Sequence, residues 1–153
     1  MTVEQKLKSL GIFLPSPIAP VANYVPYVIS GKIISISGQI PIMDDGTIPT
    51  GKVGDTLSVE EAYQFARQCG INLITQMKVA CDGDLERVVR VVKLGGFVNC
   101  NPNFGKEPAV INGASDLMVE VFGEKGRHSR SSVGVASLPL NVPVEIDALI
   151  EID

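Results

Sequence analysis

The sequence predicts a single α+β domain. Segments rich in β-branched residues occur near both ends of the chain, and two segments with helical periodicity lie between them. The chain has 153 residues, which is the size of one domain with one core. No internal repeat or low-complexity segment divides it, so residues 1–153 are taken as one unit. The expected order is two or three strands, a helix, a strand, a second helix and two final strands.

The first part of the chain predicts a short helix, an arm and a hairpin. Residues 3–10 can form the helix, and the prolines between residues 15 and 20 then favour an extended arm that leads to Tyr24. Residues 25–36 are rich in β-branched residues and are interrupted by Ser-Gly-Lys at residues 30–32. This pattern is typical of a β-hairpin, because glycine permits the backbone of a tight turn.

The next segment predicts a loop followed by a long helix. A third strand can begin after Gly38, and residues 43–54 contain the Asp, Gly and Pro residues of a loop. Ser58 and Glu61 have the spacing of a capping box, which marks a helix start. Apolar residues then recur at steps of three and four until the Asp-Gly pair at residues 82–83, where we expect the helix to end.

A central strand and a second helix are expected after that pair. Residues 85–98 begin as a turn and continue as a Val-rich strand, in which Gly95-Gly96 indicates a bulge or a close backbone approach. Turn-forming residues occupy positions 101–108. Residues 110–121 then show the periodicity of a second amphipathic helix, which ends at Gly123.

Residues 130–145 place Arg130 and Glu145 on two predicted strands separated by a Pro/Asn turn. Arg130 shares a face with Ser132, and the last strand buries its even-numbered residues. If these strands form a hairpin that turns near Pro139, the two charged residues are offset by roughly three positions, or about 10 Å. We then expect no direct pairing, and the register that decides whether they share a face cannot be read from the sequence.

This pair of residue types suits an anionic substrate and a reacting water. A guanidinium group stays charged and holds a carboxylate through two parallel hydrogen bonds. A glutamate can accept and return a proton near neutral pH if its surroundings raise its pKa. The alternative is an exposed ion pair, which contributes little to stability and has no function.

Four short motifs in order indicate a family. They are Ser37-Gly38-Gln39-Ile40-Pro41 after a β-type segment, Arg130-Ser-Ser-Val, Leu138-Pro and Val144-Glu145-Ile146. With them, residues 17–152 resemble the RidA/YjgF/YER057c/UK114 family, also called the endoribonuclease L-PSP family. Tyr24 lies thirteen residues before Ser37, and Glu145 lies fifteen after Arg130, which are the intervals of the family's site residues.

The resemblance implies a fold, an assembly and an activity. The fold is a mixed sheet of the chorismate mutase-like type with two main helices on one face, and the assembly is a homotrimeric barrel with sites between subunits. The activity is hydrolysis of reactive enamines and imines to 2-oxo acids and ammonia, without a cofactor or metal. By analogy, Arg130 binds the substrate carboxylate and Glu145 deprotonates the attacking water.

The resemblance also assigns supporting roles. Tyr24 closes the pocket, Ser37 belongs to the site, and the backbone N–H groups of Gly38 and Ser132 orient the substrate. Asn112 lies near a position that contacts ligand in the family.

The chain departs from the family pattern in several places. Ser132 stands where many deaminase members carry cysteine. Residues 1–16 form an N-terminal extension, and the loops at residues 43–57 and 99–106 are enlarged against compact members. His128 does not fall on a matched position, so it is either a general acid or, as we expect, part of a loop hydrogen bond.

The amino-acid composition argues against several classes of partner and cofactor. The formal net charge of −4 gives no electrostatic support for a nucleic acid partner, and one His with three Cys lacking CxxC spacing argues against a metal site. No segment has the apolar run of a signal peptide or membrane span, so we expect a cytoplasmic protein. The 45% hydrophobic content indicates a further copy covering apolar surface.

Three functions stay open: an imine deaminase, a non-catalytic binder of small carboxylates, and an endoribonuclease.

Overall fold

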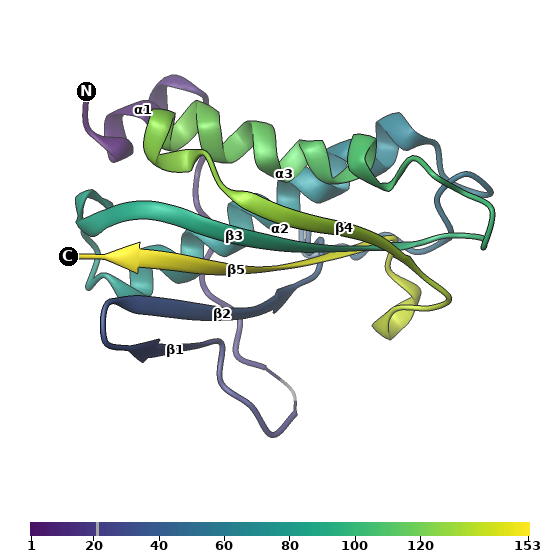
Figure 1. Cartoon of the computed structure of the whole chain (residues 1–153), viewed down its shortest axis with the longest axis horizontal. Coiled ribbons are helices and arrows are strands. Elements are labelled where there is room, and N and C mark those ends of the chain that lie inside the picture. Colours follow the sequence, from purple (N-terminus) through teal and green to yellow (C-terminus); the bar gives the residue numbers. More distant parts are fainter. Residues whose placement is uncertain (21) are drawn as a thin grey trace.

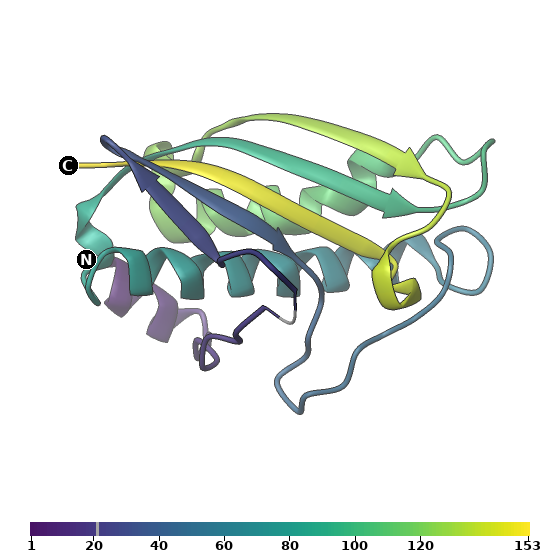
Figure 2. The ribbon, with the colours of Figure 1, turned by 90° about the horizontal axis from the view of Figure 1, so that it is seen from below.

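A five-stranded sheet with helices on one face makes up the fold (Figure 1). The computed structural model describes residues 1–20 and 22–153. The elements are α1 (Val3–Ser9), β1 (Tyr27–Ser30), β2 (Ile33–Gln39), α2 (Val59–Ala80), β3 (Val88–Asn99), α3 (Glu107–Phe122), β4 (Ser129–Val135) and β5 (Val144–Ile152), with 3₁₀ turns η1 (Leu85–Arg87), η2 (Gly123–Gly126) and η3 (Pro139–Asn141). The predicted α+β class is confirmed. In Figure 2 the helices lie on one side of the sheet, and its other face is uncovered.

The strand order is β1-β2-β5-β3-β4. β3 and β4 run parallel, as α3 returns the chain between them, whereas the other neighbouring strands are antiparallel. The sheet is therefore mixed. The expected hairpin of the last two strands is wrong, because β3 lies between β4 and β5 and pairs with both. The predicted third strand after Gly38 is also wrong: β2 continues to Gln39, and residues 40–57 carry only isolated bridges at Val53.

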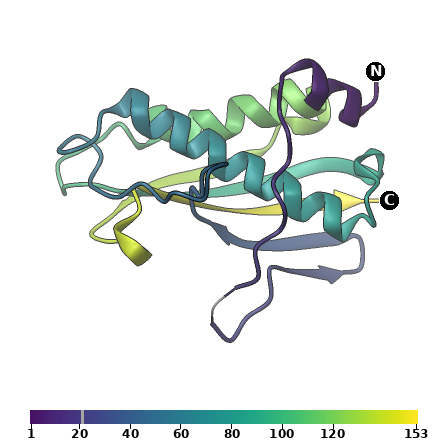
Figure 3. The ribbon, with the colours of Figure 1, turned by 180° about the vertical axis from the view of Figure 1, so that it is seen from behind.

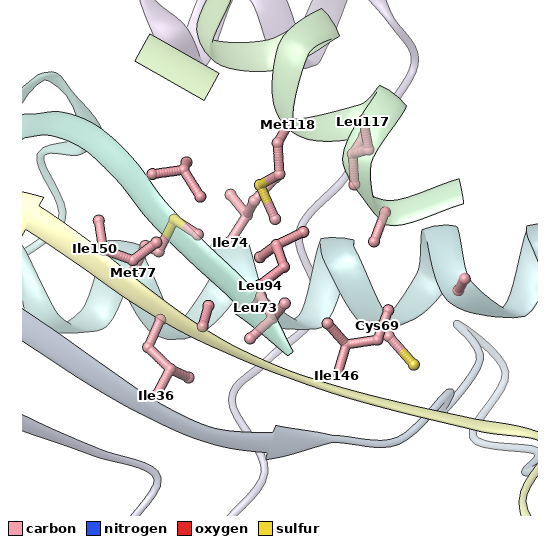
Figure 4. Close-up of a cluster of buried hydrophobic side chains, with 14 of the residues drawn as sticks. Ile36, Cys69, Leu73, Ile74, Met77, Leu94, Leu117, Met118, Ile146 and Ile150 are labelled. Carbon is pink, nitrogen blue, oxygen red and sulfur yellow. The ribbon is translucent and has the colours of Figure 1, made fainter. Parts of the chain in front are cut away.

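Local signals place the two long helices correctly. Ser58 accepts a hydrogen bond from the backbone N–H of Glu61, and the Glu61 side chain returns one to Ser58, so the predicted capping box is confirmed. The apolar face of α2 packs on β5 and β2, and that of α3 packs on β3 and β4. Residues of β5 alternate between buried and half-buried, and the even-numbered ones point into this core. Figure 4 shows this core, with Leu73 and Met77 from α2, Met118 from α3 and Ile146 from β5.

The two long helices approach each other closely at Gly113 and Gly70. A Cβ on Gly113 would meet the backbone of α2 at the Tyr63 carbonyl and at the amide nitrogen of Arg67. A Cβ on Gly70 would instead meet mainly the side chain of Leu117, 2.8 Å away. Only at Gly113 does the obstruction consist of backbone, which cannot move aside without separating the helices.

Gly113→Ala is therefore expected to lower the free energy of unfolding by about 1–3 kcal/mol, the usual cost of overpacking. Gly70→Ala is the matched control. Its loss should be smaller, because the Leu117 side chain can shift; the gain of about 1 kcal/mol from alanine in a helix applies to both variants. Urea unfolding followed by circular dichroism measures both. Equal stability of Gly113→Ala and wild type would contradict the close approach.

Gly95 and Gly96 in β3 mark close approaches and not a bulge. A Cβ on Gly95 would meet the Asp147 carboxylate on one face of the sheet, and a Cβ on Gly96 would meet Ile111 of α3 on the other. The register shifts of β3 against β5 lie earlier, between Val88 and Arg90 and between Val91 and Lys93. The pair thus lets Asp147 and α3 lie against the strand from opposite sides.

The N-terminal segment packs on the outside of the helices. α1 lies beside α3, and the arm that follows crosses α2 on its way to β1 (Figure 3). The described residues of the arm, 15–20 and 22–24, contain no helix or strand, as expected; the arm prediction at Val21 lies outside the described residues. Among the described helices, none has the length and apolarity needed to cross a membrane.

The three cysteines are free and buried. Burial raises the pKa of the Cys69, Cys81 and Cys100 thiols above the ordinary value. None of them is thus activated as a thiolate at neutral pH.

Candidate functional site

Arg130 is anchored on the helix side of the sheet. It lies on β4 opposite Leu94 of β3. Its Nη1 donates to Asn112 Oδ1 at 2.7 Å and to Ser115 Oγ at 3.0 Å, and its Nη2 donates to the Pro108 carbonyl at 3.3 Å. All three acceptors belong to α3, so this helix fixes the orientation of the guanidinium.

The anchoring leaves Arg130 free to bind an anion. Three of its five N–H donors are engaged by α3, so one on Nε and one on Nη2 are left. These two point the same way and match the two oxygens of a carboxylate. No carboxylate among the described residues lies within ion-pair distance of Arg130. The site thus presents an unpaired positive charge with a preset direction.

Ser115 links Arg130 to His128. His128 Nδ1 lies 2.6 Å from the Gly126 carbonyl and its Nε2 lies 2.9 Å from Ser115 Oγ. A carbonyl only accepts, so the neutral ring carries its proton on Nδ1, and Nε2 accepts from the Ser115 hydroxyl. The lone pairs of that hydroxyl then face Arg130. His128 does make a loop hydrogen bond, and through Ser115 it also helps to position the guanidinium.

Ser132 follows Arg130 on the same face of β4. Its Oγ is the one buried side-chain polar atom of the described residues that has no hydrogen-bond partner. A buried hydroxyl without a partner lowers the stability of the fold, so this atom is suited to hydrogen bond to a group that the described residues do not supply. Asn112, Ser115, Arg130 and Ser132 are called the arginine half-site below.

Glu145 lies on the opposite, helix-free face of the sheet. Its neighbours Val144 and Ile146 point into the core, so Glu145 points away from the helices. A register shift in β2 between Ile36 and Gln39 brings Gly38 against it, and a Cβ on Gly38 would overlap the Glu145 carboxylate. The glycine is thus required for the carboxylate to lie against the β2 backbone.

Two causes raise the pKa of Glu145. The first is desolvation of its half-buried side chain, and the second is the negative charge of Asp147, two residues along the same face. Burial also raises the pKa of Asp147, although hydrogen bonding from the Gly95 N–H and the charge of Lys93 oppose this. A carboxylate with a raised pKa is suited to accept a proton at neutral pH.

Tyr24 and Ser37 lie near Gly38. Ser37 Oγ donates to the Val25 carbonyl at 2.7 Å, and the Ser37 N–H donates to the Pro26 carbonyl at 2.9 Å. Ser37 thereby fixes the end of the arm, on which Tyr24 is 52% exposed. Tyr24, Ser37, Gly38 and Glu145 are called the glutamate half-site below.

A cavity of about 590 Å³ adjoins the glutamate half-site. Its walls are residues 15–20 of the arm, the end of β2, residues of the loop between 40 and 48, and a face of α2. Tyr24, Ser37 and Gly38 lie at its border. This space is called the arm cavity below.

The structure thus separates the residues that the sequence suggested for one site. Arg130, Ser132 and Asn112 lie together on the helix side, whereas Tyr24, Ser37, Gly38 and Glu145 lie together across the sheet. One copy of the chain cannot bring the two groups to a single small molecule. The described residues hold no cluster of three or more His, Cys, Asp or Glu side chains that fits a metal ion.

Sequence reasoning missed two features of the site. Ser115 lies three residues after Asn112, so it shares a helix face with Asn112, and this spacing was the available signal. The alternation of side chains along β5 places Asp147 on the same face as Glu145, so the effect of its charge could have been predicted. The raised pKa of Glu145 also depends on burial beside β2, which only the folded structure shows.

Known proteins are similar in sequence along nearly the whole chain. A family model described as "YjgF/chorismate mutase-like, putative endoribonuclease" matches residues 4–151. Protein TCP17 of Trypanosoma cruzi is 50% identical, with 99% of this chain and 94% of that protein covered. A Dermatophagoides farinae protein named 2-iminobutanoate/2-iminopropanoate deaminase is 32% identical over 91% of each chain.

Solved structures show that the fold is also shared. A Shewanella oneidensis protein described as a putative endoribonuclease superposes with a TM-score of 0.94 at 36% identity, covering 99% of this chain and 100% of its own. The mixed sheet with helices on one face is thus the fold of the YjgF-like class of α+β proteins. The chain belongs to the RidA/YjgF family.

Proposed function

We propose that this protein hydrolyses reactive imines and enamines derived from 2-amino acids, releasing 2-oxo acids and ammonia. The observation that carries the proposal is the pairing of a guanidinium that has two unused, parallel donors with a half-buried carboxylate whose pKa is raised. The relative named as an imine deaminase supports the same chemistry.

The site forms where two copies of the chain meet. The arginine half-site of one copy would face the glutamate half-site of the next, because the two lie on opposite faces of one sheet. When two different surfaces of identical copies bind each other, a closed assembly forms only if the copies are arranged in a ring. The homotrimer implied by the family resemblance is such a ring. The helix-free face also carries Val133, which is 44% exposed and which a neighbouring copy would cover.

Each group has one task in the reaction. Arg130 binds the substrate carboxylate through Nε and Nη2, and the backbone at Gly38 and Ser132 orients the imine. Glu145 accepts a proton from a water as the water oxygen bonds to the carbon of the protonated imine, which gives a neutral carbinolamine. Glu145 then returns this proton to the nitrogen. As the C–N bond breaks, the carbinolamine hydroxyl gives its proton to Glu145, the ketone forms and ammonia leaves.

The test is ketone formation from imino acids generated in situ by an amino-acid oxidase. We expect the protein to accelerate the appearance of the 2-oxo acid beyond spontaneous hydrolysis, in proportion to its concentration. If no imine is hydrolysed faster than in buffer, while 2-oxo acids still bind, the protein is a carboxylate binder.

RNA cleavage is disfavoured by the charge of the site. The helix-free face presents Glu145, Asp147 and Glu151 on one strand, and these repel phosphates. The single histidine is engaged with Gly126 and Ser115 and cannot form an acid–base pair with a second one.

Asp147→Asn should shift the acidic limb of the pH profile. Glu145 works only when ionised, and its pKa is raised in part by the charge of Asp147. Removing that charge lowers the pKa of Glu145, so the fall of kcat/KM on acidification should move to lower pH. Glu151→Gln removes a carboxylate from the same face without being a cause of the shift, and it should leave the limb in place. A limb that stays fixed in Asp147→Asn would show that Asp147 does not tune Glu145.

A further inference from the structure

The arm cavity is larger than a small substrate needs. It measures about 590 Å³, within the range of cavities that enclose drug-sized ligands. It begins at Gly38, the residue against which the Glu145 carboxylate lies. Glu145 itself does not line the cavity, so a substrate whose reacting carbon lies beside Glu145 would extend into this space past Gly38. An ethyl side chain, as in 2-iminobutanoate, would leave it mostly empty.

The walls of the cavity are mainly apolar. Its lining includes Ile18, Ile40, Ile42, Met43, Ile48 and Leu140. Ile18 and Leu140 are exposed when the cavity is empty, so an occupant would remove their apolar surface from water. This lining selects for apolar groups.

One polar side chain in the wall has no hydrogen-bond partner among the described residues. Gln68, Asn72 and Gln76 follow one another at four-residue steps on α2. Gln68 donates to Asn72, which donates to the carbonyls of Ile40 and Ile42 and so fixes the loop. Gln76 is 3% exposed and lines the cavity, yet its amide makes no hydrogen bond to the described residues. The Gln76 amide is not fully buried, so it is open to the cavity and can hydrogen bond to an occupant.

We propose that the arm cavity binds the substrate's side chain, and that this side chain is large and apolar, with a hydrogen-bonding atom at its far end that meets Gln76. The inference rests on the proposed function and names its substrate class. Imines of amino acids with butyl, benzyl or hydroxybenzyl side chains are then preferred over the two-carbon side chain of 2-iminobutanoate.

A homologous series tests the apolar part. Imines with ethyl, propyl and butyl side chains are generated by an amino-acid oxidase, and kcat/KM is measured for each. Each buried methylene should raise kcat/KM about fourfold, so the butyl substrate should exceed the ethyl one on the order of tenfold. Ile42→Trp, which fills the cavity, should abolish this gain. A flat series in wild type, or an unchanged gain in Ile42→Trp, would overturn the proposal.

A pair of aromatic imines tests Gln76. The wild type should prefer the hydroxybenzyl over the benzyl side chain, and Gln76→Met, which keeps the size of the side chain, should lose this preference. Gln64→Met makes the same substitution at an exposed position of α2 and should retain it. Melting temperatures show that each variant is folded. If Gln76→Met keeps the preference for the hydroxyl, the amide does not contact the ligand.

Calorimetry separates this inference from the proposed function. Binding of 2-oxobutanoate and 2-oxohexanoate to the wild type needs no catalysis. Tighter binding of the longer acid, lost in Ile42→Trp, upholds the cavity even if no imine is hydrolysed. Glu145-dependent hydrolysis with equal affinity for both acids upholds the function and refutes the cavity assignment.

Discussion

Glu145→Gln is expected to reduce kcat for imine hydrolysis by about 10²-fold or more, the usual contribution of a general base. Glutamine keeps the size of the side chain and can still hydrogen bond to water, but it cannot accept a proton. Affinity for 2-oxo acids should stay near that of wild type, because the proposed site holds the carboxylate with Arg130 and not with Glu145. Steady-state kinetics on in situ imines and calorimetry with 2-oxobutanoate measure the two effects.

Asp147→Asn is the matched control for this variant. It makes the corresponding exchange two residues further along the same face of β5, and at neutral pH it should retain most of kcat. Equal turnover in Glu145→Gln and wild type would remove Glu145 from the mechanism. A parallel loss of turnover and binding would instead mean that Glu145 holds the ligand.

Arg130→Ala should weaken binding of small 2-oxo acids by about 10²-fold or more. Two hydrogen bonds to a charged group are lost, and each contributes about 1.5–3 kcal/mol. Arg130→Lys should recover only part of the affinity, since one ammonium cannot reproduce two parallel donors. Calorimetry with 2-oxobutanoate provides the measurement, and unchanged affinity in the alanine variant would make Arg130 a structural residue.

Ser115→Ala gives the graded comparison. It removes one of the three contacts that orient the guanidinium but leaves Asn112 and Pro108 in place. The loss of affinity should therefore follow the Arg130→Ala effect in direction and be smaller, and it should appear in KM more than in kcat. An effect on kcat alone would place Ser115 near the reacting atoms.

Mixing the two inactive variants tests whether copies share the site. In a ring assembled at random from equal amounts of Arg130→Ala and Glu145→Gln chains, about a quarter of the interfaces combine an intact Arg130 with an intact Glu145. Activity should return to about that fraction of wild type after unfolding and refolding together. No recovery in rings shown by mass spectrometry to be mixed would mean that both groups act within one copy.

The sequence predicted those parts of the fold that depend on neighbouring residues. The capping box at Ser58, the helical periodicity of α2 and α3, and the alternation along β5 all express contacts within a few residues. The strand order depends instead on contacts between residues far apart in the sequence. Residues 136–143 carry the chain past β3, so β4 pairs with a strand some forty residues earlier, and no local pattern distinguishes this path from a hairpin.

The same limit applies to the site. Family spacing identified Arg130 and Glu145, and period two assigned each to a face of its own strand. Only the intervening β3 fixes the two faces as opposite, since Leu94 aligns with Arg130 and Phe97 with Glu145. The positioning role of Ser115 depends on how α3 packs over β4, which is tertiary information.

The burial of the cysteines has a consequence for oxidative stress. Peroxides attack thiolates that are ionised and accessible, and here burial keeps Cys69, Cys81 and Cys100 protonated and covered. Ser132 supplies a hydroxyl at the position where many deaminases of the family carry a thiol, so no sulfenic acid can form beside Arg130. The arginine half-site therefore contains no thiol for a peroxide to oxidise.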